Sequence, residues 1–595
     1  MADAGRPAGA AMRWWGWGQQ DHEPGLPAHA LEFLRETVGV AERPRPPVAL
    51  ENVQLPASAL GEGEMAALGA LIGAEGVRCD HAERVLHAAG KGYVDLVRMR
   101  AGEPEGAPDV IAYPASHEQV RALLEHCARA SIAVVPFGGG TSVVGGLAPL
   151  RGSHRAVLSL DTSRMAGLLG LDRESATATV AGGMRAPALE RQLAAEGLTL
   201  GHYPQSYEYV SLGGCAATRS AGQASSGYGT IAKMVLGARL AAPAGELALP
   251  PLPATAAGPD LRELLVGSEG TLGVISELDL RVRPAPRERV YLGVFFETFL
   301  AGVHAMRAFA REHVLPDVAR LSDEHETQMS LALAGGGGLK GRLGRAYLGL
   351  RGYSEGCLAI LGFEGSREDV NFRRGRALAL AHGVGAISAG HSPGEAWLAS
   401  RFQAPYLRDE LLTHGVMVET LETAAQWTNI ATLHTTVADA IATALEEWQT
   451  PAYVMCHVSH VYETGASLYF TFLARQREDD PVGQWQAVKR AASEAIVAGG
   501  GTITHHHAVG RDHAPWMEHE VGALGLGAIA ALKVELDPAG IMNPGKLLPG
   551  EAAEGGAAKG EAAAGKTVVG KPTQSEGAPG RAAPGEGVRG EAVPG

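Results

Sequence analysis

From about residue 108 onwards, the spacing of apolar positions predicts strands that alternate with helices. Residues 116–130 begin with Ser and carry apolar side chains three and four positions apart, which is typical of a capped helix. The β-branched run 132–135 follows at once and predicts a strand. Further strands are expected at 108–114, 157–160 and 177–180, and a further helix at 186–196. Together these elements indicate an α+β domain.

Beyond residue 287 the pattern changes to longer helical runs between strand-like runs. The strand-like runs are 290–296, 358–363 and 467–473, and the helical runs are 300–312, 367–382 and 435–448. This order is typical of a second α+β domain built on an antiparallel sheet.

The two ends of the chain differ from its middle. The first hundred residues look helical and rich in loops. Residues 551–595 contain 11 Gly, 11 Ala and 4 Pro but no aromatic residue, so they cannot bury enough apolar surface to become ordered. We therefore predict an N-terminal region at 1–105, domains at 106–286 and 287–490, a C-terminal segment at 491–549 and a disordered tail at 550–595.

Composition and charge narrow the class of protein. Of 595 residues, 46% are hydrophobic and 19% charged, which excludes bulk disorder. The net charge of −14, with no long basic run, argues against nucleic-acid binding. Five scattered cysteines without a CxxC pair fit a reducing cytoplasm. Neither an apolar signal region nor an apolar run of membrane-spanning length is present. We expect a cytoplasmic protein and leave peripheral membrane contact open.

A glycine-rich turn directly follows the strand predicted at 132–135. Adjacent glycines permit positive φ and close backbone approach, and their N–H groups can form an anion site suited to a pyrophosphate. The alternative is a tight turn without a ligand. A Walker loop is excluded because the turn lacks Lys, and the GxGxxG-like string at 525–530 follows a helical stretch rather than a strand. The candidate residues are Pro136, Phe137, Gly138, Gly139, Gly140, Thr141 and Ser142.

Two further regions of small residues follow along the chain, and three such regions in this order suit one long dinucleotide lying across a domain. The second region contains Pro204, Gln205, Ser206, Gly213, Gly214, Thr218, Arg219, Ser220 and Ala221. The third contains Glu269, Gly270, Thr271, Leu272, Gly273, Val274 and Ile275.

In this order the regions resemble the FAD-binding domain of the vanillyl-alcohol oxidase type, and within that group the chain looks most like the alkyldihydroxyacetonephosphate synthases. The resemblance covers roughly residues 12–548. It rests on RWWGWG at 13–18, PFGGGTS at 136–142, GSEGTLGVI at 267–275, YLRD at 406–409, THHHAVG at 504–510 and the closing stretch 537–548.

The resemblance implies an FAD-binding domain at 106–286, a cap domain for the substrate at 287–490 and a segment at 491–549 that completes the active site. FAD would be held non-covalently by the three glycine-rich regions. The family exchanges the acyl group of acyl-dihydroxyacetone phosphate for a fatty alcohol, with no net oxidation, and we expect a homodimer.

Three consecutive histidines, His505, His506 and His507, follow the strand-like residues 502–504. On an extended chain at most two of them would share a face. Histidine titrates near neutrality and suits proton transfer. The alternative is a solvated or metal-binding histidine run, although a closed zinc site lacks a Cys at ligand spacing, and we expect no metal. The resemblance implies that the trio takes part in catalysis.

The resemblance also assigns roles to three other side chains. Tyr469, in a strand-like aromatic run, is the candidate general acid or base, although a core tyrosine is the simpler interpretation. Its phenol would need a positive neighbour to lower its pKa from about 10. Arg408 would bind the anionic substrate, and Arg320 would be needed for activity; a surface arginine is the alternative for Arg408.

The runner-up function is an FAD-linked dehydrogenase or oxidase of a 2-hydroxy acid such as D-lactate or glycolate. The string NPGK at 543–546 resembles the ending of D-lactate dehydrogenases, and Gln205 stands where an acidic residue is usual in the synthases. Metal-assisted members of the runner-up group carry a GDGNLH string, which the corresponding strand 456–462 lacks. A third possibility is a non-catalytic flavin-binding protein, against which the combination of Arg408, Tyr469 and the histidines argues.

Overall fold

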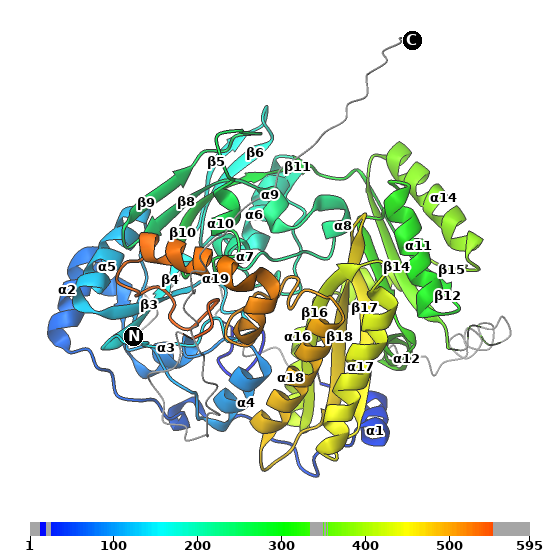
Figure 1. The fold of residues 1–595 in the computed structure, drawn as a ribbon, viewed down its shortest axis with the longest axis horizontal. Helices are drawn as coiled ribbons and strands as arrows, with labels where there is room; N and C mark the ends of the chain where they lie inside the picture. The colour runs from blue at the N-terminus through cyan, green and yellow to red at the C-terminus, as the bar shows by residue number, and fades with distance from the viewer. Residues whose placement is uncertain (1–11, 20–24, 334–348, 350–352, 354, 551–595) are drawn as a thin grey trace, which may run out of the picture. The chain divides into compact units, whose positions relative to one another are not determined.

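The structure is a computed structural model that describes residues 12–19, 25–333, 349, 353 and 355–550. Figure 1 shows the order of its helices and strands. All described residues fall in one compact unit that spans residues 1–555. Except for Gly550, the predicted tail lies outside the described residues.

Two sheets form the part of the molecule that carries the glycine-rich regions. Its parallel strands are mostly apolar, as expected for strands buried on both faces; every residue of β4 is buried, including Ser159 and Asp161. The four-stranded sheet has the order β1 (Val77–Arg78), β2 (Val110–Ala112), β4 (Ala156–Asp161) and β3 (Ile132–Phe137). The five-stranded antiparallel sheet has the order β5 (Leu168–Asp172), β6 (Thr177–Ala181), β10 (Val274–Arg281), β8 (Val235–Ala242) and β9 (Gly245–Leu249). A two-stranded ladder joins β11 (Arg283–Pro284) to β7 (Leu198–Thr199).

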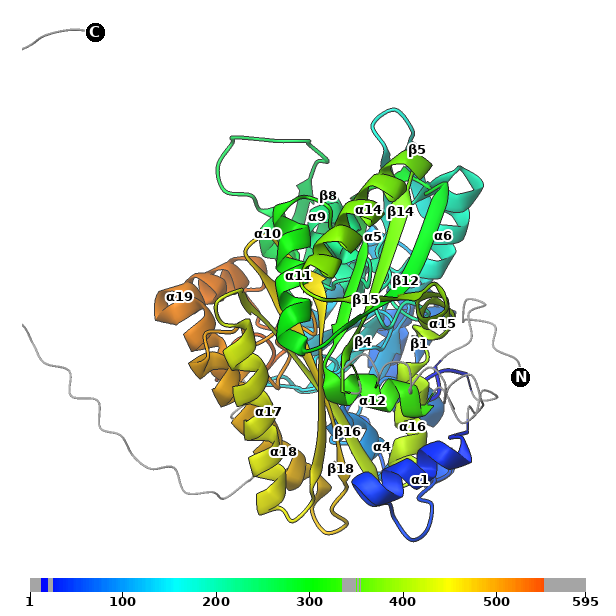
Figure 2. The same ribbon diagram turned by 90° about the vertical axis from the view of Figure 1, so that its right-hand side faces the viewer.

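A seven-stranded antiparallel sheet forms the second large layer, as the alternation of strands and helices predicts. Its order is β15 (Ile387–Gly390), β12 (Glu288–Phe296), β14 (Cys357–Gly365), β13 (Val318–Ser322), β17 (Ala452–Val461), β18 (Gly465–Arg475) and β16 (Val416–Gln426). Figure 2 shows helices α17 (Ile430–Glu447) and α18 (Pro481–Ala498) along one side of β16 and β18. Phe470 and Phe472 of β18 are buried on that side.

The predicted helices are confirmed within a few residues at their ends. The helices expected at 116–130, 186–196, 300–312, 367–382 and 435–448 correspond to α5 (His117–Ala130), α6 (Ala186–Ala195), α11 (Phe299–Arg311), α14 (Arg367–Gly383) and α17. Ser116 caps α5 by accepting the N–H of Gln119, as its place in the sequence predicts. The other helices are α1 (Ala28–Thr37), α2 (Glu62–Ile72), α3 (His81–Leu86), α4 (Tyr93–Ala101), α7 (Leu212–Ala217), α8 (Ser225–Tyr228), α9 (Ile231–Met234), α10 (Arg262–Leu265), α12 (Glu324–Leu333), α15 (Ser392–Ser400), α16 (Ala404–Thr413) and α19 (Met517–Leu536).

The C-terminal segment returns to the first sheet. Val134 of β3 donates its N–H to the carbonyl of Ile541, and Asn543 donates back to Val134. The GxGxxG-like string at 525–530 lies inside α19, so its rejection as a dinucleotide loop is confirmed. Among the described residues, none of the helices is long and apolar enough to cross a membrane.

Candidate active site

One face of the seven-stranded sheet carries a row of polar side chains. Glu422 of β16 lies opposite Tyr469 of β18, and Tyr469 lies opposite His457 of β17. Directly opposed residues share a face of a sheet, so these three side chains project to the same side. Phe470, next in sequence, is fully buried on the other side. Strand alternation thus separates a polar face from the apolar face that packs on the helices.

Arg320 of β13 joins this row through His457. Ser322 pairs with His457, and Arg320 lies two positions earlier on the same face. Its NH1 group donates to Nε2 of His457 at 3.1 Å, and its NH2 group donates to Oε1 of Glu326 at 2.7 Å. Nδ1 of His457 lies 2.9 Å from the same oxygen. The imidazole stacks on Tyr469 with ring centroids 4.8 Å apart, so Arg320 reaches Tyr469 through His457.

A β-bulge brings a further histidine to this face. The register of β17 and β18 shifts between Val458 and Val461. An extra residue in one strand redirects the side chains beside it. His460 consequently stacks on His505 with ring centroids 4.9 Å apart, and its Nδ1 lies 2.5 Å from the hydroxyl of Ser225.

The histidine loop, residues 504–510, lies against this row. The prediction that 502–504 forms a strand is wrong, because these residues form no ladder and the loop instead wraps around the carboxylate of Glu422. One Glu422 oxygen accepts the hydroxyl of Thr504 at 2.7 Å and the backbone N–H groups of His506 and His507 at 2.9 and 2.8 Å. The other accepts the N–H of His505 at 2.6 Å.

The three imidazoles divide between two neighbours. His506 and His507 face Tyr469, with ring centroids 6.0 and 5.4 Å from it. His505 instead places Nε2 2.6 Å from the hydroxyl of Tyr462. Two of the three histidines therefore face the tyrosine. This division is produced by the conformation of the loop, because the chain here is not an extended strand.

Burial determines the charge states of these histidines and of Glu422. Burial lowers the pKa of His505 and His506 to about 4 and also lowers the pKa of His507, so all three rings are neutral at pH 7. Burial opposes the charge of Glu422 as well, but two effects outweigh it and hold the pKa of this carboxyl well below its usual range. These are the attraction to the charge that His505, His506 and His507 carry only when protonated, and the N–H donors of the loop, which act at every pH.

Tyr469 does not have the electrostatic environment that the sequence analysis required. Burial raises the pKa of its phenol to about 12, and the nearby carboxylates of Glu422 and Glu419 act in the same direction. Arg320 lowers the pKa of the phenol, but burial outweighs it, so the lowered pKa that the sequence analysis required is not found. Tyr469 carries its proton at neutral pH and is suited to donate it.

The three glycine-rich regions meet in space. A side chain at Gly139 would place Cβ 2.4 Å from the carbonyl oxygen of Tyr209, so the first region packs directly on the loop of the second. Gly270, at φ +73°, would place Cβ 2.8 Å from Cγ of Pro136, so the third region packs on the first. Only glycine fits at these contacts.

The first glycine-rich turn has unused hydrogen-bond donors. The backbone N–H groups of Gly138, Gly139, Gly140, Thr141 and Ser142 donate to no other group in the described part of the chain. The turn is half-buried, and clustered N–H groups of this kind form an anion site.

Arg408 lies apart from the tyrosine and the histidines. Its NH1 group donates to the carbonyl of Lys91 at 2.6 Å, and its Nε is buried without a partner among the described residues. Lys91 donates its own backbone N–H to the carbonyl of Ser142 at 2.6 Å. Arg408 thus borders the glycine-rich turn rather than Tyr469.

Comparisons with known proteins agree with this arrangement. Residues 108–248 match the model of the FAD binding domain family, and residues 285–547 match that of the C-terminal domain of FAD linked oxidases. The alkyldihydroxyacetonephosphate synthase of Dictyostelium discoideum is 34% identical over 476 residues, which cover 79% of this chain and 78% of that protein. The Trypanosoma brucei brucei enzyme of the same name is 32% identical over 90% of this chain and 92% of its own length.

The chain belongs to the alkyldihydroxyacetonephosphate synthase family. A solved alkyldihydroxyacetonephosphate synthase structure superimposes with a TM-score of 0.77 at 29% identity, covering 90% of this chain and 98% of the other. The resemblance inferred from the sequence is confirmed, as are the α+β fold with FAD-binding and cap domains and FAD as the cofactor.

The residues present fit FAD in this synthase family member. The unused N–H groups of the first glycine-rich turn can receive the pyrophosphate, and Gly138 to Ser142 would hold it. The close contacts at Gly139 and Gly270 keep the three regions together as one surface.

Several residues predicted to bind the cofactor have side chains that form hydrogen bonds within the protein or are buried in its core. Gln205 donates to the carbonyl of Arg401 at 2.8 Å. Arg219 binds the carbonyl of Val266 and the carboxylate of Glu263. Ser220 pairs with His202, and Thr218 and Thr271 donate to nearby carbonyls. The apolar residues Ala221, Leu272, Val274 and Ile275 are buried.

Sequence reasoning missed four polar residues of the site. Glu422, His457, His460 and Glu326 were not candidates, and β16 was not predicted. The available signal for Glu422 was a carboxylate within the run 416–425, which contains Val, Met, Leu, Thr and Ala and one other glutamate, Glu419. His457 and His460 lay in a strand that was considered only for the metal motif it lacks.

Proposed function

We propose that the protein exchanges the acyl group of acyl-dihydroxyacetone phosphate for a fatty alcohol and so forms the ether bond of alkyl-glycerone phosphate. The supporting observation is a protonated tyrosine, Tyr469, placed against two neutral histidines, beside a surface that fits FAD. The names of the most similar relatives support the same reaction.

The exchange breaks the bond between the substrate carbon and the acyl oxygen and forms a bond to the oxygen of the alcohol. The acyl group takes up a proton and leaves as a carboxylic acid, and the alcohol loses its proton, so the two proton transfers balance. When bound, FAD supplies a ring system that can take up and return an electron pair, so no external acceptor is consumed. The chain must supply a proton donor for the leaving carboxylate and an acceptor for the alcohol proton.

Tyr469 is suited to be the donor because its pKa of about 12 keeps the phenol protonated. His506 and His507 are suited to be acceptors because burial keeps their rings neutral. His457 stacks on the tyrosine ring, and Arg320 donates a hydrogen bond to His457. Arg408, beside the glycine-rich turn, is the candidate for binding the phosphate of the substrate.

The test is an assay of the purified protein with palmitoyl-dihydroxyacetone phosphate and a labelled hexadecanol, without oxygen or any electron acceptor. Labelled ether lipid is the expected product. A parallel dye-reduction assay with D-lactate and glycolate examines the runner-up reaction. Strict dependence on an added acceptor would assign the protein to that oxidoreductase class, and bound FAD without either reaction would favour the non-catalytic alternative.

Non-covalent binding of FAD, a homodimer, a cytoplasmic location and peripheral membrane contact stay predictions. Acid precipitation tests the first, because a non-covalent flavin leaves the yellow colour in the supernatant.

A further inference from the structure

The histidine loop is held from two sides by carboxylates that belong to different parts of the molecule. Glu422 comes from β16 of the seven-stranded sheet, and Glu269 comes from the third glycine-rich region. We propose that Glu422 and Glu269 are positioning residues that together fix the conformation of the histidine loop and so aim His506 and His507 at Tyr469. This inference rests on the proposed function only in assigning the histidines a catalytic role.

Glu422 holds the first half of the loop. Its side chain is fully buried and accepts four hydrogen bonds, three from consecutive backbone N–H groups and one from Thr504. Three of these bonds fall on Oε1 and one on Oε2, so both oxygens of the carboxylate are engaged by the loop. Because three successive amides point at one group, the backbone of His505 to His507 has little freedom to turn.

Glu269 holds the second half. Its two oxygens accept the N–H groups of Val509 and Gly510 at 2.8 and 2.7 Å. Its own backbone carbonyl accepts a hydrogen bond from the side-chain amide of Asn543 at 2.6 Å. The side chain of Glu269, which the sequence analysis assigned to the cofactor, forms its hydrogen bonds with the histidine loop instead.

Ala508 lies between the two anchored halves of the loop, and its backbone has a left-handed conformation. Ala508 has φ +77°, in the left-handed region that is unfavourable for a residue with Cβ. Such a conformation persists only where surrounding contacts impose it, and the two carboxylates anchor the chain immediately before and after it. Gly510, at φ +54°, lies so close to Val144 that a Cβ would stand 2.1 Å from its carbonyl oxygen.

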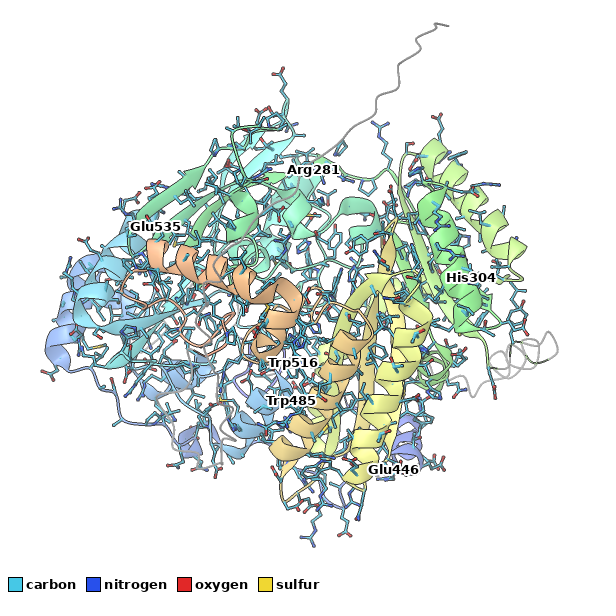
Figure 3. All side chains as sticks on the ribbon, viewed as in Figure 1. Arg281, His304, Glu446, Trp485, Trp516 and Glu535 are labelled. Carbon is cyan, nitrogen blue, oxygen red and sulfur yellow. The ribbon has the colours of Figure 1, made fainter. Side chains whose placement is uncertain are left out.

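The chain offers a matched control for each carboxylate. Glu419 is also buried on β16 but faces the helices, where it accepts the indole N–H of Trp485, labelled in Figure 3, at 2.5 Å. Glu190 accepts the backbone N–H groups of Leu200 and Gly201, both at 3.0 Å, in a loop remote in sequence from the histidines. Replacing either control carboxylate changes a glutamate that accepts two or three hydrogen bonds, without touching residues 504–510.

The experiment compares Glu422→Gln with Glu419→Gln, and Glu269→Gln with Glu190→Gln, all as FAD-loaded proteins. The first readout does not depend on activity: the rate at which diethyl pyrocarbonate modifies the peptide containing His505 to His507, followed by mass spectrometry. We expect an increase of at least about 10-fold in each test variant and less than about 2-fold in each control. The second readout separates kcat from KM; kcat should fall by about 10²-fold with little change in KM.

Modification rates in both test variants equal to those of their controls would overturn the proposal. The proposal would also be overturned if kcat fell only in proportion to a loss of bound FAD, or to a loss of thermal stability that the control variant shows as well. If Glu422→Gln does not fold, the Glu269→Gln comparison decides alone. If the wild-type protein shows no exchange reaction but the histidine reactivities change as expected, the proposed function fails and the positioning role stands.

Discussion

Replacing Tyr469 by Phe removes one hydroxyl and keeps the ring that the site packs on. The stack with His457 at 4.8 Å and the edge contact with His507 at 5.4 Å both involve the ring, so FAD binding and folding should be preserved. Loss of a general acid costs ~10²-fold or more in turnover. A 10²-fold loss corresponds to about 2.7 kcal/mol in the activation barrier.

The dependence of turnover on pH distinguishes an acid from a base at this position. With a pKa of about 12, Tyr469 is protonated throughout the range from pH 6 to 9.5. If Tyr469 acts as a proton donor, its protonation state does not change in this range, and it therefore causes no change of turnover with pH. A required phenolate would instead make turnover rise about tenfold for each pH unit.

The assay measures labelled ether lipid formed by wild type, Tyr469→Phe and a control, Tyr453→Phe. Tyr453 belongs to the same sheet, but its hydroxyl donates to the carbonyl of His325 at 2.9 Å, away from the histidine loop. The control should lose less than about 3-fold in turnover. If Tyr469→Phe keeps its FAD and matches the control, Tyr469 is not the proton donor and the proposed mechanism loses its main support.

Three further predictions concern FAD, the phosphate site and pH. Gly139→Asp should abolish FAD binding, measured by flavin absorbance, because its Cβ would collide with Tyr209 and its carboxylate would repel the pyrophosphate. The control Gly375→Asp, at a position on α14 with open space around it, should bind FAD normally. Arg408→Ala should raise KM by ~10-fold or more with a smaller effect on kcat, whereas replacement of the half-buried Arg374 by Ala should not; equal KM values for the two variants would remove Arg408 from the phosphate site. Burial lowers the pKa of His202 to about 4, so its contribution to stability is present above pH 6.5 and lost as pH falls toward 4. When the pH falls from 7.5 to 5, the free energy of unfolding measured in urea should decrease by about 2 kcal/mol more for the wild type than for His202→Gln. Equal decreases would contradict a buried neutral ring.

Much of the fold follows from local signals in the sequence. The apolar spacing of α5 predicts a helix and the β-branched run of β3 predicts a strand, whatever their tertiary surroundings. Both signals, and the helix cap, depend only on residues a few positions apart in the sequence. The glycines of the first turn were recognisable for a similar reason, since only glycine tolerates the backbone contacts at Gly139.

The motif THHHAVG identified the histidine loop, but its conformation depended on distant residues. The sequence predicted a strand there, whereas Glu422, 83 to 85 positions away from the three histidines, supplies the hydrogen bonds that hold a loop. Glu269, 240 positions from Val509, completes it. No local pattern reports such contacts.

The charge of the site was likewise decided by tertiary structure. The sequence determined that a tyrosine and three histidines are present, and the histidines suggested positive neighbours for the phenol. Packing removed them from water, which leaves the imidazoles neutral and raises the pKa of Tyr469 to about 12. The residue types come from the sequence, but their protonation states come from burial, which exists only once strands distant in the chain have come together.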